Sequence, residues 1–133
     1  MAKTVMGRLV MPEVDAVLES ASPPMRALAE ALMQQVLRLH PEPCIVAWPK
    51  QRIISFGFGP KKMSEHYCYI GIQSKHINAG FYYGATLPDP ESLLEGTGKY
   101  LRHVKVASAA TLQQPSMTTL LTAAIAERRA VLE

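Results

Sequence analysis

The chain has 133 residues, of which 48% are hydrophobic and 19% are charged, as is typical of a globular domain. We therefore expect residues 1–133 to form a single domain. The formal net charge of +3 is too small to indicate nucleic-acid binding by itself. No apolar run approaches the roughly 20 residues that a membrane-spanning helix needs, so we expect no membrane association.

The residue types that carry metal or redox chemistry do not form a recognisable pattern. Cys44 and Cys68 give neither a disulfide framework nor a CxxC pair. The four histidines lack metal-ligand spacing, and no G-x-S-x-G elbow is present. The N-terminal residues contain no adequate apolar segment for a signal peptide. These observations predict a cytoplasmic protein that is not an enzyme and holds no metal through a sequence motif.

Helical patterns lie at the two ends of the chain. Residues 1–11 show little pattern, so we expect a tail. Pro12 suits the start of a short helix, and Ser22-Pro23 suits the start of a longer one that continues to Leu39 with apolar residues at helical spacing. Pro115 begins a terminal helix with the same kind of spacing.

Strand patterns fill the middle of the chain. Short β-rich or alternating runs predict five strands at residues 44–48, 52–58, 66–74, 77–83 and 100–106. In the third run, alternation places Cys68 on one face and both Tyr67 and Tyr69 on the other. Asp89 as N-cap, Pro90 and Gly96 predict one short helical turn before the last strand. The predicted fold class is α+β, with two layers and the N- and C-terminal helices on one face of an antiparallel sheet.

The segment Gly96-Thr97-Gly98-Lys99 joins that turn to the last strand. Its backbone N–H groups and lysine would suit a phosphate or carboxylate, although the spacing is not that of a Walker motif. The alternative is structural, in which Gly96 ends the helical turn and Gly98 supplies a positive φ. The predicted anion-binding residues are Gly96, Gly98, Lys99, Arg102, His103 and Lys105.

The last three of these residues alternate along a strand. Arg102 would share its face with Val104 and Val106, where burial would require a carboxylate such as Asp89 or Glu95. His103 and Lys105 would lie on the other face, either meeting an anion or exposed to solvent.

Aromatic residues and glycines also alternate along the predicted strands. Such a surface forms a groove with a floor of backbone, which suits a planar or apolar ligand, whereas a homodimer interface is the alternative. The residues assigned to this helix-free face include Tyr67, Gly57 and Gly71, and the predicted groove consists of Trp48, Tyr69, Gly80 and Tyr82.

Three segments carry a resemblance to a known family: Trp48 with Ile54-Ser55-Phe56-Gly57, His76-Ile77-Asn78-Ala79-Gly80-Phe81, and a run from Leu87-Pro88-Asp89-Pro90 through LLEGTGK to Arg102-His103. Together they resemble the YdhG-like family of small bacterial α+β domains. The resemblance covers about residues 22–126. It implies a frataxin-like sheet-plus-helix fold and, for some members, an iron-chaperone role, while it implies no catalytic residues.

These patterns predict a non-enzymatic domain that binds a small anionic molecule. The first alternative is an iron chaperone, although the predicted long helix carries a single acidic residue, Glu30, and iron needs several oxygen ligands. The second alternative is a homodimeric interaction module. We expect neither nucleic acid nor membrane as a partner.

Overall fold

The computed structural model describes residues 3–5 and 8–133 and confirms the α+β fold class. Its main sheet has five antiparallel strands, each paired with the next strand along the chain. In spatial order these are β3 (Cys44–Trp48), β4 (Ile53–Gly57), β5 (His66–Ile72), β6 (Ile77–Phe81) and β7 (Arg102–Val106). The antiparallel sheet that the grouped strands predicted is therefore confirmed, and its strand order is that of a meander.

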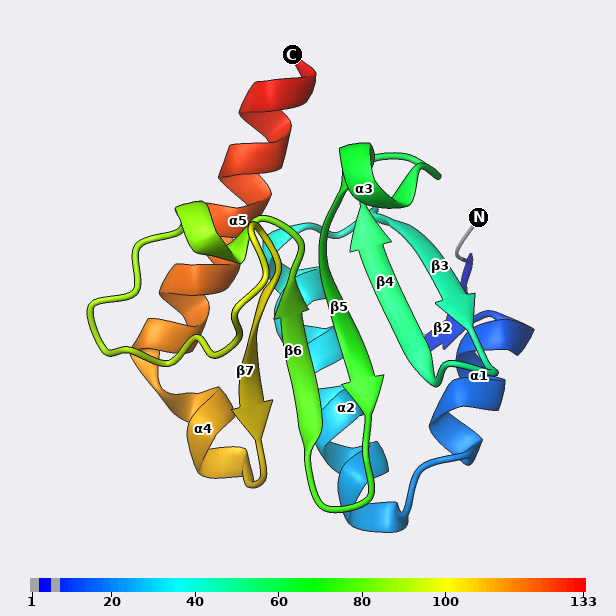
Figure 1. Cartoon of the computed structure of the whole chain (residues 1–133). Helices are drawn as coiled ribbons and strands as arrows, with labels where there is room; N and C mark the ends of the chain where they lie inside the picture. The colour runs from blue at the N-terminus through cyan, green and yellow to red at the C-terminus, as the bar shows by residue number, and fades with distance from the viewer. Residues whose placement is uncertain (1–2, 6–7) are drawn as a thin grey trace.

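The main helices are α1 (Pro12–Glu19), α2 (Pro23–Leu39) and α5 (Pro115–Leu132). Each has a proline in its first turn, where the missing N–H leaves no hydrogen bond unmade. In Figure 1, α2 and α5 pass behind the sheet and leave its front largely uncovered. We refer to that front as the open face.

Alternation along the strands separates the core from the open face. Phe56, Ile70 and Phe81 are fully buried and belong to the cluster that includes the apolar side chains of α2 and α5. Burying side chains of this size supplies most of the stability of such a domain. Their neighbours in sequence, such as Tyr69 and Gly80, point to the open face.

A β-bulge changes which face of the sheet His66 and Tyr67 occupy at the start of β5. The register between β4 and β5 shifts at Phe56/Gly57, so that Gly57 pairs with His66 and Phe56 with Cys68. The extra residue reverses the alternation on that side. Tyr67 therefore lies on the helix side, where its hydroxyl contacts His40 Nδ1 at 2.7 Å. Our assignment of Tyr67 to the helix-free face is wrong.

The segment before β7 is not the predicted short helix. The Asp89 carboxylate accepts hydrogen bonds from the N–H groups of Leu93 and Leu94, at 2.8 and 2.9 Å, but the chain forms turns and a bridge there. Ser92 has a φ of 54°, which ends any helical run. Gly96 has the left-handed φ of 123° that we expected at Gly98.

Several short elements were not predicted. Strands β1 (Lys3–Val5) and β2 (Arg8–Val10) form a separate antiparallel pair, so the expected tail is wrong for these residues, whereas residues 1–2 and 6–7 lie outside the described part. The others are α3 (Lys62–Glu65), η1 (Gly84–Thr86) and α4 (Ala109–Gln113). The last strand begins at Arg102, two residues later than we expected. The short helical turns α3, η1 and α4 pack against strands β4 or β7, which hold them because such short helical runs are unstable alone.

Candidate functional site

A pocket of about 360 Å³ lies on the open face beneath α3. Three of the four predicted groove residues line it: Trp48 from the end of β3, Tyr69 from β5 and Tyr82, which directly follows β6. The other lining residues are Gln51, Ile53, Lys62, Met63 and Leu101. A mostly apolar hollow with a few polar groups is the usual form of a small-molecule site, and this volume is near the lower end of the usual range.

The fourth groove residue, Gly80, forms the floor beneath Tyr69. Tyr69 and Gly80 are paired neighbours on β5 and β6, and the Tyr69 ring occupies the space that a side chain at position 80 would need. The ring also packs against Tyr82, with the centroids 5.4 Å apart. Gly80 therefore makes room for the Tyr69 ring, which covers it, and does not face a ligand directly.

The polar side of the pocket includes a lysine from α3. The Lys62 ammonium lies 5.5 Å from the centre of the Trp48 ring, a distance at which a cation is attracted to the face of an indole. Met63, the next residue of α3, is 48% exposed and forms part of the rim. The pocket thus combines stacking surfaces with a positive charge.

A chain of buried hydrogen bonds leads away from the pocket wall. The Tyr82 hydroxyl lies 2.8 Å from Ser55 Oγ, which lies 2.5 Å from His66 Nδ1. On the other side of the imidazole, Nε2 lies 2.8 Å from the Gly59 carbonyl oxygen. Ser55 and His66 are fully buried, and Tyr82 is 4% exposed.

The partners fix the direction of this chain. Because the Gly59 carbonyl can only accept, Nε2–H donates to it, and Nδ1 of the neutral ring accepts from the Ser55 hydroxyl. The Ser55 oxygen then accepts from Tyr82. Burial lowers the pKa of His66, an effect that the hydrogen bond to Gly59 and the charge of Glu65 oppose. Burial also raises the pKa of Tyr82 to about 12.

The predicted anion-binding residues divide between two places. Gly96, Gly98 and Lys99 lie on the exposed segment before β7, where the Lys99 ammonium lies 5.3 Å from the centre of the Tyr100 ring. His103 and Lys105 lie on the open face, because they alternate with the buried Val104 and Val106. The structure does not place all six residues around one hollow.

Arg102 holds the segment before it. Its Nη1 donates to the carbonyl oxygens of Gly98 and, at 2.9 Å, of Leu101. Within residues 3–5 and 8–133, no carboxylate lies at ion-pair distance from this guanidinium, so the expected pairing with Asp89 or Glu95 is wrong. The two carbonyl oxygens accept hydrogen bonds from the guanidinium, so these donors are paired without a carboxylate.

His103 connects the two predicted sites. It pairs with Gly80, which pairs in turn with Tyr69, so the three residues form one row across β7, β6 and β5. His103 therefore lies on the same face as the aromatic pocket and one strand beyond the Tyr69 ring. The glycine pattern predicted the aromatic wall, and the alternation of β7 predicted that His103 and Lys105 share one face of the sheet.

Lys62, Met63 and Leu101 line the pocket but were not predicted. Lys62 and Met63 belong to a one-turn helix that the sequence presents as part of a turn, and Leu101 precedes β7. Three large apolar side chains in these segments, Met63, Tyr100 and Leu101, are between 43% and 48% exposed. In the sequence, Met63 and Leu101 stand out only as large apolar residues within otherwise polar connecting segments.

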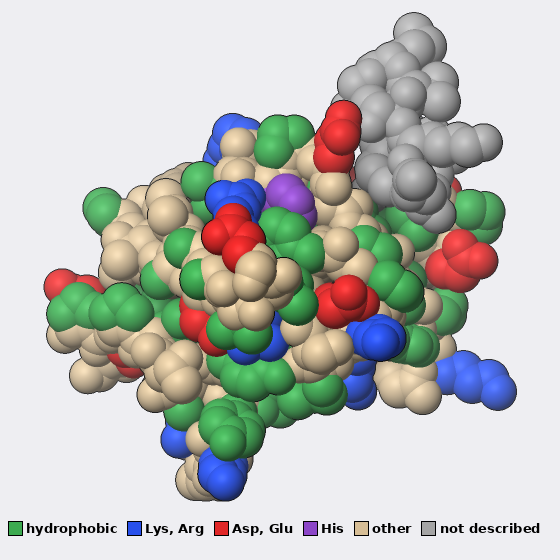
Figure 2. Space-filling model, turned by 90° about the horizontal axis from the view of Figure 1, so that it is seen from above, with side chains coloured by type: hydrophobic (Ala, Val, Ile, Leu, Met, Phe, Trp, Pro, Cys, Tyr) green, Lys and Arg blue, Asp and Glu red, His purple; other side chains and the backbone are tan. Residues whose placement is uncertain are grey.

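Charged side chains of both signs are interspersed over the upper end of the molecule. Figure 2 shows Lys and Arg beside Asp and Glu, with hydrophobic side chains gathered along the lower edge, which corresponds to the front of Figure 1. The described residues contain no group of three or more His, Cys, Asp or Glu that could hold a metal ion. None of the described helices combines the length and apolarity that a bilayer crossing requires.

Comparison with known proteins identifies no relative. No protein-family model, curated protein or solved structure matches this chain. The likeness to YdhG-like domains stays a prediction, as does the iron-chaperone role that it implies. The function must therefore be inferred from the pocket itself.

Proposed function

We propose that this protein is a binding domain for a small planar molecule with an anionic group. The ligand would occupy the pocket on the open face, with its planar part against Trp48 and Tyr69 and its anionic group near Lys62. The observation that supports this best is the placement of aromatic rings and one ammonium group around a single hollow of about 360 Å³. Aromatic stacking and one charge-assisted contact would provide both affinity and orientation.

The anion site proposed at Lys62 replaces the one that the sequence predicted around Lys99. Lys62 lines the pocket, whereas Nη1 of Arg102 already donates to two carbonyl oxygens of its own segment. Lys105 lies on the same face and would add positive potential at its edge. The segment from Gly96 to Lys99 is then the alternative location, and the experiment should separate the two.

A thermal-shift screen of aromatic carboxylates, each paired with its uncharged amide, tests the function. Ligands that bind the native state raise the melting temperature with concentration, and we expect the acids to stabilise more than the amides. The same acid is then titrated against Lys62→Met, Lys61→Met and Lys99→Met. Lys61 is the matched control because it adjoins Lys62 but does not line the pocket.

Each outcome locates the ligand. We expect Lys62→Met to weaken binding of the acid about twofold to fivefold, as for a partly exposed ion pair, with no change for the amide. An effect of Lys99→Met without one of Lys62→Met would place the anion on the segment before β7. No stabilisation by any acid or amide would end the proposal.

Self-association through the open face is the second candidate. Met63, Tyr100 and Leu101 expose large apolar groups near the pocket, and such groups are enriched at interfaces between subunits. Sedimentation velocity of the parent and of Leu101→Glu over a range of concentrations tests it. A dimer that the substitution dissociates supports this function, and a monomeric parent at every concentration rejects it.

A further inference from the structure

The wall of the pocket that α3 forms is not held in place by any buried side chain of α3. Lys62 and Met63 belong to α3, which has four residues and no buried side chain. A single helical turn gains too few internal hydrogen bonds to be stable alone. Its position relative to Trp48 must therefore depend on contacts with other segments.

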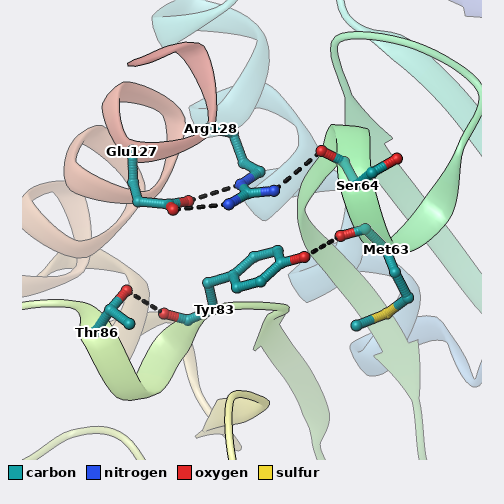
Figure 3. A network of polar contacts seen from close by, with 6 residues as sticks. All are labelled: Met63, Ser64, Tyr83, Thr86, Glu127 and Arg128. Atoms are coloured by element: carbon teal, nitrogen blue, oxygen red, sulfur yellow. Dashed lines mark hydrogen bonds and ion pairs between the residues drawn. The ribbon is translucent and has the colours of Figure 1, made fainter. Parts of the chain in front are cut away.

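Two side chains from distant segments bind the backbone of α3 (Figure 3). The Tyr83 hydroxyl donates to the Met63 carbonyl oxygen, and Arg128 Nη1 donates to the Ser64 carbonyl oxygen at 2.9 Å. Tyr83 precedes η1 and Arg128 lies near the end of α5. Neither residue lines the pocket.

Arg128 is itself held rigidly. Its Nε and Nη2 donate to the two carboxylate oxygens of Glu127 at 2.7 and 2.8 Å, and its guanidinium lies 3.7 Å from the centre of the Tyr83 ring. The residue is 5% exposed. A fork bound at both edges and stacked on a ring has little freedom to move, so it presents Nη1 to Ser64 in one position.

The other end of α3 is attached to the sheet. Phe58 N–H, directly after β4, donates to the Glu65 carbonyl oxygen at 2.9 Å, and the bond from Glu65 N–H to the Lys61 carbonyl oxygen, also 2.9 Å, closes the helical turn itself. These bonds fix where α3 joins β5, but they do not hold the backbone of Met63 and Ser64. The carbonyl groups of those two residues are the ones that Tyr83 and Arg128 bind.

We propose that Tyr83 and Arg128 are positioning residues for the pocket. They hold α3, and through it Lys62 and Met63, at the distance from Trp48 that the ligand requires. The functional part of this inference rests on the proposed binding function. The structural part can be measured without ligand, because Trp48 is the single tryptophan of the chain and reports on its own surroundings.

Tyr83→Phe is the sharpest variant. It removes the hydroxyl that binds Met63 and keeps the ring beneath Arg128, so we expect the protein to fold. Tyr67→Phe is the matched control, since it removes a tyrosine hydroxyl that contacts His40 on the helix side. Both variants are compared by acrylamide quenching of Trp48 fluorescence, by urea unfolding, and by calorimetric titration with naphthalene-2-sulfonate.

We expect Tyr83→Phe to increase the quenching of Trp48 and to weaken binding of the probe about twofold to tenfold, as for one lost hydrogen bond. Tyr67→Phe should lower stability without either change. Unaltered quenching and affinity in Tyr83→Phe, or equal changes in both variants, would overturn the inference. A parent protein that fails to bind the probe counts against the proposed function, and the quenching comparison still decides whether Tyr83 positions α3.

Discussion

The ring of Tyr69 lies directly over Gly80, its neighbour across β5 and β6. A Cβ atom built at position 80 would fall less than 3.0 Å from several ring atoms, whereas one built at Gly71 would have its nearest neighbour at 3.6 Å. The two glycines lie on the same face of the sheet and differ in what covers them. Gly80 is therefore required by the wall of the pocket, and Gly71 is not.

Gly80→Ala should displace the Tyr69 ring and destabilise the protein by about 1–3 kcal/mol, the usual cost of overpacking a filled space. Gly71→Ala should be neutral or slightly stabilising, because alanine reduces the freedom of the unfolded chain and meets only ordinary contacts. Urea unfolding of the two variants measures the difference. Equal stabilities would show that Tyr69 can move aside freely, and the pocket would then have no fixed wall there.

Ser55→Ala should cost more stability than Tyr82→Phe. The serine lies at the centre of the buried chain, and its loss leaves both the Tyr82 hydroxyl and His66 Nδ1 without a partner. Each buried group left unpaired costs about 1–3 kcal/mol. Tyr82→Phe removes only the outer donor and keeps the bond from Ser55 to His66. A larger loss in Tyr82→Phe than in Ser55→Ala, measured by urea unfolding, would contradict this order.

The sequence predicted the architecture because the main elements follow the periodicity of their own residues. The long helix from Pro23 and the alternation of Cys68, Ile70 and Ile72 depend on local spacing, which the structure confirms. Three of the four groove residues were predicted for the same reason, since Trp48, Tyr69 and Tyr82 belong to strands or directly follow one. Local pattern thus predicts the face of a sheet well.

The missed features depend on contacts between distant segments. Alternation assigned Tyr67 to the wrong face because a bulge opposite Gly57 inserts one residue, which no local pattern reveals. The contribution of Lys62 depends on Arg128 holding α3 from another part of the chain. The Asp89 carboxylate accepts backbone hydrogen bonds as a helix N-cap does, but no helix follows it. In each case tertiary contacts override local preference.

The stability should fall as the pH is lowered from 7 to 5. Burial lowers the pKa of both His40 and His66 below the ordinary value of 6.5. Between that value and the lowered one, the unfolded chain binds more protons than the folded protein, so acidification favours unfolding. The loss begins as the pH drops below about 7 and continues until the folded-state pKa is passed. Each tenfold difference in proton affinity between the unfolded and folded states contributes about 1.4 kcal/mol to it.

His66→Asn tests the contribution of the buried chain to this pH dependence. The variant will be less stable at every pH, so the quantity to compare is the difference in the free energy of unfolding between pH 7 and pH 5. That difference should be smaller in His66→Asn than in the parent, and His40 should account for part of what is left. The same difference in both proteins would mean that His66 has an ordinary pKa in the folded state.

The two thiols should differ sharply in reactivity. Cys68 is 3% exposed within the core of β5, and burial raises the pKa of its thiol, so the reactive thiolate is both rare and inaccessible. Cys44 is partly exposed at the start of β3. With Ellman's reagent the native parent should release one equivalent of product quickly, and Cys44→Ser should release almost none until urea unfolds it. Cys68→Ser should behave as the parent does. Rapid reaction of native Cys44→Ser would show that the sheet opens locally around β5, and the fixed pocket wall that Tyr69 provides from the same strand could not then be maintained.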